Sequence, residues 1–180
     1  MPQQSSKQFF SKWAGGSHAL QRFLFHPGGP LWRYCLLAAP LAIIPSIIST
    51  AIICALLETL GVNTSALLPL GPEHTFKGFF GVVVGAPVIE TFLLAWTISI
   101  LSSFNKGRIF VAAGAAILWG ALHALGGVLW FFGTAWSFFV FSAAYLAWRQ
   151  TSFKHAYMAA AITHALVNLT AMLLTLTDLF

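Results

Sequence analysis

Charged side chains are scarce in this chain. Only 7% of its 180 residues are Asp, Glu, Lys or Arg, while 58% are hydrophobic and the mean hydropathy is +0.83. An ordinary soluble domain carries about 25% charged residues, so the composition excludes that class. It predicts an integral membrane protein whose length suits a single domain.

Cysteine is also rare, and strand-like alternation of apolar and polar residues is missing. Cys35 and Cys54 fall in one apolar run without metal-type spacing, so we interpret them as small core residues and expect neither a disulfide nor a nucleophile. The hydrophobic runs are continuous, which argues against a β-barrel. Because a helix satisfies its own backbone polar groups in lipid, the predicted fold class is all-α, a polytopic membrane helix bundle.

The apolar runs predict about five transmembrane helices, each needing roughly 17 to 25 residues. They are expected at about residues 32–58, 77–104, 109–126, 134–148 and 155–177. Gly61 is the expected C-terminal cap of the first helix. The fourth helix starts earlier if the aromatic run before residue 134 lies in the bilayer, and residues 126–133 then form a tight or re-entrant turn.

Residues 1–30 differ from the rest of the chain. They mix polar and basic residues with aromatics and end in a Pro-Gly-Gly-Pro run, which predicts an interfacial N-terminal segment that is helical in part. Residues 31–180 are expected to form a single transmembrane domain.

The formal net charge is +5, yet the basic residues lie next to predicted span ends. This placement is typical of orientation signals and argues against a nucleic-acid partner. Eight basic residues fall on one side and Lys77 alone on the other, which predicts a cytoplasmic N-terminus. The eight are Lys7, Lys12, Arg22, Arg33, Lys106, Arg108, Arg149 and Lys154. The membrane we expect is a bacterial inner membrane.

Four polar side chains interrupt the apolar spans: Glu90, His123, His164 and Asn168. An ionisable group at such depth costs roughly 2.5 to 3.5 kcal/mol on insertion scales, so a membrane chain that keeps one uses it or pairs it. Small residues share the helix face of each of the four, and His164 and Asn168 share one face because they are four residues apart. We therefore predict helices that converge on one cavity.

A carboxylate, two imidazoles and an amide are a workable set for hydrolysis without a cofactor. Glu90 would take a proton from water with the help of His123, and His164 and Asn168 would donate to the oxyanion of a scissile carbonyl. The alternative is zinc held by Glu90, His123 and His164 with a fourth position open. Against zinc, the chain has no His-Glu-x-x-His run.

One of the four, His123, falls closer to the end of its span than the others do. We therefore expect the third helix to continue to about Trp130, which would bring His123 level with Glu90 and His164.

The order and spacing of these residues resemble a known family. The motifs, in chain order, are Pro87-x-x-Glu90-Thr91, Trp119-x-x-x-His123 and His164-x-x-x-Asn168. Together they are similar to the CPBP family, the intramembrane proteases named for CAAX and bacteriocin processing, which include the CAAX prenyl endopeptidases. The similarity covers about residues 80–172.

The resemblance implies an endopeptidase that cleaves a membrane-associated peptide or protein by a glutamate-driven, metal-free mechanism. Glu90 and His123 would activate water, and His164 and Asn168 would form the oxyanion hole. In the family the first motif is usually Glu-Glu-x-x-x-Arg and the second usually opens with Phe. This chain has Thr91, Ala95 and Trp119 at the positions of the second Glu, the Arg and the Phe.

Two other functions stay open from the sequence. A protein with this fold could serve as a bacteriocin immunity or interaction protein, its polar residues acting as interhelical hydrogen bonds. A proton or ion path through Glu90, His123 and His164 ranks last, because such a path needs polar groups spread across the membrane and the inner ends of the spans offer none.

Overall fold

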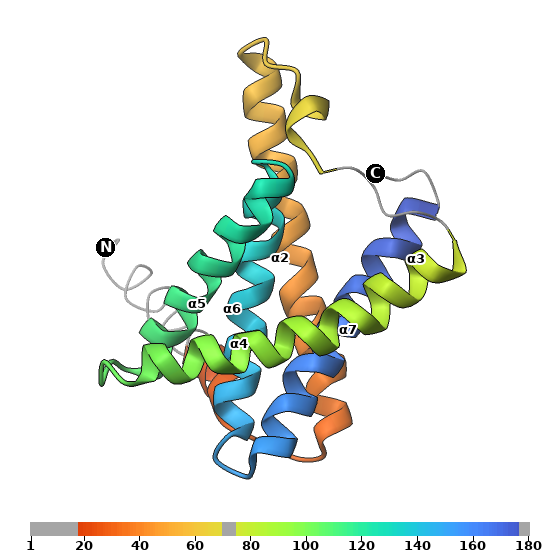
Figure 1. Ribbon diagram of the computed structural model, residues 1–180. Helices are drawn as coiled ribbons and strands as arrows, with labels where there is room; N and C mark the ends of the chain where they lie inside the picture. The colour runs from red at the N-terminus through yellow and green to blue at the C-terminus, as the bar shows by residue number, and fades with distance from the viewer. Residues whose placement is uncertain (1–17, 70–74, 177–180) are drawn as a thin grey trace, which may run out of the picture.

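A computed structural model describes residues 18–69 and 75–176 as helices joined by short connections (Figure 1). Five helices are long and apolar enough to cross a membrane, and no strand occurs in those two ranges. The predicted fold class is confirmed: this is an all-α, multi-pass membrane protein. The spans are α2 (Leu31–Thr59), α3 with α4 (Phe76–Ser102), α5 (Arg108–His123, extended by a 3₁₀ turn over Ala124–Gly126), α6 (Trp130–Trp148) and α7 (Phe153–Leu176).

The end of α2 agrees with its sequence signal. Gly61 has a φ of +77°, in the left-handed region that favours glycine, and its N–H donates to the Glu58 carbonyl at 2.9 Å. The next N–H, of Val62, donates to the Leu57 carbonyl at 3.0 Å. These bonds satisfy carbonyls that the helix end leaves open, so the predicted cap is confirmed.

Inside α2, a proline frees a backbone carbonyl that another helix satisfies. Pro45 has no N–H to bond the Leu41 carbonyl four residues earlier. Trp136 of α6 replaces it, since its Nε1–H donates to that carbonyl at 2.7 Å. Beside it the hydroxyls of Ser46 and Ser137 pair at 2.9 Å. The proline therefore creates a point of attachment between α2 and α6, because lipid contains no water that could bond the freed carbonyl.

Replacing Trp136 with Phe should weaken this attachment. Interhelical hydrogen bonds in membrane bundles contribute about 0.6 kcal/mol on average and up to about 1.7. We expect the upper end here, because the substitution strands the Leu41 carbonyl, and the measurement is thermal unfolding in detergent. Trp96→Phe is the control, at a tryptophan 65% exposed on α4. Equal losses for both variants would show that ring volume, not the hydrogen bond, matters.

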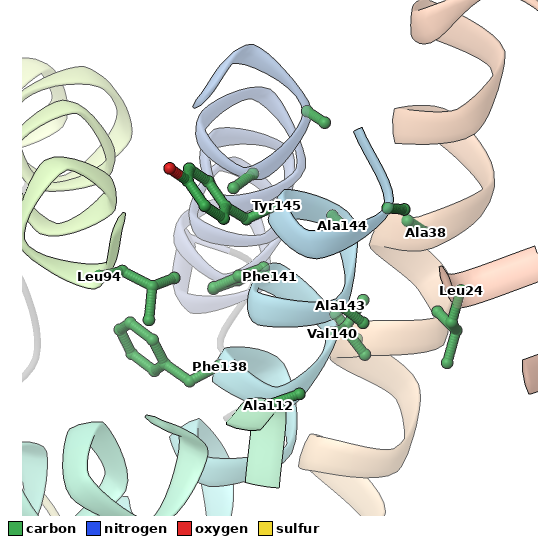
Figure 2. Close-up of a cluster of buried hydrophobic side chains, with 14 of the residues drawn as sticks. Leu24, Ala38, Leu94, Ala112, Phe138, Val140, Phe141, Ala143, Ala144 and Tyr145 are labelled. Carbon is green, nitrogen blue, oxygen red and sulfur yellow. The ribbon is translucent and has the colours of Figure 1, made fainter. Parts of the chain in front are cut away.

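Helix α6 forms the centre of the bundle and packs against α2, α5 and α7. Its buried face presents the large rings of Phe138 and Phe141 to one side and alanines to the other (Figure 2). Ala38 of α2, Leu94 of α4 and Ala112 of α5 approach it from three directions. The alanines let neighbouring backbones come close, which is how membrane helices gain packing without a hydrophobic driving force.

Helix α4 (Ala86–Ser102) crosses the bundle obliquely and contacts α5 and α7 (Figure 1). Its outer face is apolar and open to lipid, with Ile89 and Phe92 both 62% exposed. Its inner face carries Thr91, Leu94 and Ala95, all buried. The oblique course brings the middle of α4 over the other helices.

The N-terminal segment is attached to one end of the bundle. Residues 18–25 are helical, as predicted in part, and Leu24 and Phe25 are buried in the common core. Tyr34 donates to the Leu24 carbonyl at 3.0 Å, and Arg108 and Gln150 both donate to the Phe25 carbonyl at 3.3 Å. Two spans, α2 and α5, and the connection after α6 thus satisfy the C-terminal carbonyls of this short helix. Residues 1–17 lie outside the described part of the chain.

The prediction that the third helix continues to about Trp130 is wrong. Helix α5 ends at His123, its 3₁₀ extension ends at Gly126, and α6 already begins at Trp130. The reason is a close approach of the connection after α2. A Cβ atom at Gly127 would lie 2.6 Å from the Pro69 nitrogen, and Leu129 N–H donates to the Leu67 carbonyl at 3.1 Å. The alternative prediction, an earlier start for the fourth span after a tight turn, is confirmed.

Candidate active site

Glu90, His123 and His164 meet inside the bundle although they come from three helices. Glu90 Oε2 lies 3.7 Å from His123 Nε2 and 3.9 Å from His164 Nε2. Asn168, one turn beyond His164 on α7, has a different neighbour: its Nδ2–H donates to the backbone carbonyl of Val82 at 2.8 Å. The structure therefore brings three of the four predicted side chains close together, and it bonds the fourth to the backbone ahead of Glu90.

The three side chains differ in exposure, which gives the cluster an open and a closed side. The exposed fraction falls from 24% for Glu90 through 15% for His123 to 5% for His164. His164 thus forms the floor of the site, and Glu90 and His123 lie nearer its exposed side, although Glu90 Oε2 itself is buried.

His123 is the last residue of α5, and its own helix orients it. Its Nδ1 lies 2.8 Å from the Trp119 carbonyl. Because a carbonyl can only accept, Nδ1 carries the hydrogen, and in the neutral ring Nε2 presents a lone pair toward Glu90. His123 is therefore arranged to accept a hydrogen bond at the site.

His164 is held by aromatic rings of α6. Phe141 stacks on it with ring centres 4.4 Å apart and planes at 21°, and Phe138 lies edge-on at 5.5 Å. Phe138 also approaches His123 to 5.0 Å, and Trp130 meets His123 edge-on at 4.9 Å. One helix thus sets the position of both imidazoles.

Sequence reasoning missed these three rings as parts of the site. The signal available was the aromatic run that begins at Trp130, but α6 is apolar on every side. Periodicity therefore could not say which rings face α5 and α7.

Glu90 makes no direct hydrogen bond to either imidazole. Separations of 3.7 and 3.9 Å exceed hydrogen-bond length. Within the described ranges, Glu90 Oε2 and His164 Nδ1 are buried polar atoms without a hydrogen-bond partner. Because buried polar atoms are usually paired, the unpaired Glu90 Oε2 between two imidazoles calls for a functional explanation.

The zinc alternative finds no support in the geometry. Among residues 18–69 and 75–176, no group of three His, Cys, Asp or Glu side chains is arranged to hold a metal ion.

The fold and the site define a class, a multi-pass helical membrane protein with a buried cluster of one carboxylate and two imidazoles. Comparison with known proteins gives no match: no family model, no curated protein and no solved structure matches this chain.

Proposed function

We propose that this chain is an intramembrane peptidase in which water attacks a peptide bond of a membrane-associated substrate. One observation carries the proposal: a single carboxylate oxygen of Glu90 faces the Nε2 atoms of two imidazoles at 3.7 and 3.9 Å inside a bundle built for lipid. A buried ionisable cluster of this kind costs insertion energy, which a purely structural helix contact does not require.

The proposed reaction begins with water between Glu90 and His123. Glu90 accepts one hydrogen of the water as a proton, and the lone pair on His123 Nε2 accepts a hydrogen bond from the other. The water oxygen attacks the scissile carbonyl carbon, and the electron pair of the C=O bond moves onto its oxygen. The Trp119 carbonyl keeps His123 in the required tautomer.

His164 acts on the carbonyl oxygen of the substrate. Its Nε2–H donates to the oxyanion as charge develops there, in a position preorganised by the stacked ring of Phe141. When the tetrahedral intermediate collapses, the C–N bond breaks and Glu90 returns its proton to the departing amine. The products are a new carboxylic acid and a new amine, with one water consumed and Glu90 regenerated as a carboxylate.

The resemblance to CPBP proteases supports this assignment, and the structure accounts for where this chain departs from the motif. Thr91 and Ala95 replace the usual Glu and Arg, and both are buried on the inner face of α4. They are one helical turn apart, so a Glu and an Arg there would be neighbours. Replacing both the Glu and the Arg leaves no unpaired charge in the core, whereas replacing only one would leave the other buried without a partner. Glu90 is then the carboxylate on which the proposed chemistry depends.

We further propose a bacterial inner-membrane location with the N-terminus in the cytoplasm. The start of α5 and the segment after α6 both bond the Phe25 carbonyl, so their basic residues, Arg108 and Arg149, lie at the same end as the N-terminal helix. Lys77 begins the span that ends near Arg108, which places it at the opposite end. This distribution supports the orientation that the positive-inside rule predicts.

The test is cleavage by the purified protein in liposomes. Membrane-anchored peptides of varied sequence are incubated with it, and mass spectrometry detects product pairs whose masses sum to the substrate plus one water. We expect His164→Ala to lower the rate by about 10²- to 10³-fold, the usual cost of an oxyanion donor. His155→Ala is the control, at an exposed histidine of the same helix.

The non-catalytic rival, an immunity or interaction protein, makes a different prediction for the same samples. No peptide would be cleaved, and His164→Ala would change only thermal stability in detergent. That pair of results would replace the peptidase proposal.

A further inference from the structure

The backbone just ahead of Glu90 carries a local irregularity. Residues Gly81–Gly85 form a π-helical turn between α3 (Phe76–Phe80) and α4, in which the Ala86 N–H donates to the Gly81 carbonyl five residues earlier. The next donor in that register would be residue 87. Residue 87 is a proline and has no N–H, so the carbonyl of Val82 is left without a partner from its own helix.

Helix α7 supplies the missing donor. Asn168 Nδ2–H donates to the Val82 carbonyl at 2.8 Å. On the other side of the proline, Tyr157 donates its hydroxyl hydrogen to the Val88 carbonyl at 2.7 Å. Both side chains belong to the helix that carries His164. The irregular turn and the start of α4 are therefore bonded, on either side of Pro87, to the same element that holds the floor of the site.

The register of this turn decides which side chain of α4 reaches the imidazoles. Successive residues of a helix point about 100° apart. A slip of one residue would exchange Glu90 for Ile89, which now faces lipid at 62% exposure, or for the fully buried Thr91. The bond from Asn168 opposes such a slip because it holds one carbonyl of the π turn.

We propose that Asn168 is a positioning residue, which sets the register of α4 and so the place of Glu90, and that it does not donate to the oxyanion. This inference rests on the proposed function for its kinetic consequence and on the contact with Val82 for its structural one. It replaces the role that the motif resemblance implies for this asparagine.

The test is a double-mutant cycle with Pro87. Asn168→Ala alone is expected to lower kcat by about 10²-fold with KM little changed, the cost of misplacing a reacting group by about 1 Å. Pro87→Ala adds an N–H in register with the Val82 carbonyl. In that background the Asn168→Ala effect on kcat should shrink by about tenfold or more. An equal effect in both backgrounds would make Asn168 a direct donor and overturn the proposal.

A second readout does not depend on activity. The four proteins of the cycle are unfolded thermally in detergent without substrate, and Asn168→Ala should lower Tm more in the Pro87 background than in the Pro87→Ala background. Additive shifts in Tm would overturn the positioning role even if peptides are cleaved. Coupled shifts without cleavage in any variant would refute the peptidase and keep the contact. Pro87→Gly supplies the same N–H if Pro87→Ala is not recovered folded.

Discussion

A Glu90→Gln variant is expected to fold normally and to cleave peptides about 10²- to 10⁴-fold more slowly than the unaltered protein. The amide keeps the size and shape of the carboxylate but cannot accept the proton of the attacking water. It also removes the oxygen charge that faces both imidazoles at 3.7 and 3.9 Å. Initial rates in liposomes, at equal amounts of inserted protein, measure the loss.

The control is Glu58→Gln, at an exposed carboxylate on the last turn of α2. Glu58 Oε1 accepts a hydrogen bond from the Thr64 hydroxyl at 2.7 Å and takes no part in the cluster. We expect this variant to cleave at the normal rate. Normal turnover by Glu90→Gln would remove Glu90 from the mechanism, and with it the proposed function.

A large loss of stability is expected from Gly120→Ala. A Cβ atom there would lie 2.9 Å from the Ala135 Cβ and 3.0 Å from the ring of Phe131, at the contact between α5 and α6. Overpacking of this kind typically costs about 1–3 kcal/mol. Because His123 lies one turn further along α5, displacement of the helix should also lower the cleavage rate. Thermal unfolding in detergent measures the loss of stability.

Gly114→Ala is the matched control on the same helix. Its added Cβ would meet only the flexible tip of Leu101, at 3.4 Å. A helix-interior alanine is favoured over glycine by about 1 kcal/mol, so stability should stay level or rise slightly. If both variants lost stability equally, close packing at Gly120 would not be the cause.

Much of the fold could be predicted from local chemistry. The scarcity of charge indicates that the chain lies in lipid. A single span in lipid must then be a helix, because a helix satisfies the hydrogen bonds of its own backbone. Gly61 marked the end of α2 correctly, because the left-handed cap is a local requirement. Both signals act within a few residues, which is why they can be read without the rest of the molecule.

The geometry of the candidate site could not be predicted from such local signals. Hydropathy places His123 near the end of its span and so predicts a longer third helix, yet α5 ends at His123 and His123 still lies 3.7 Å from Glu90. Helix α4 runs obliquely, and tilt is set by packing against neighbours and not by hydrophobic length. Asn168 was placed on the correct helix, but its partner is a carbonyl freed by a proline 81 positions away.

From the sequence alone followed the class of protein, the approximate limits of its spans and the few polar residues that lipid makes expensive, because each depends on the cost of moving a short segment out of water. Only the tertiary structure decided that Glu90, His123 and His164 meet, that aromatic rings of α6 hold the imidazoles, and that Asn168 bonds the backbone before Glu90. Those outcomes depend on how five helices tilt and interlock, and no single segment encodes its neighbours' positions.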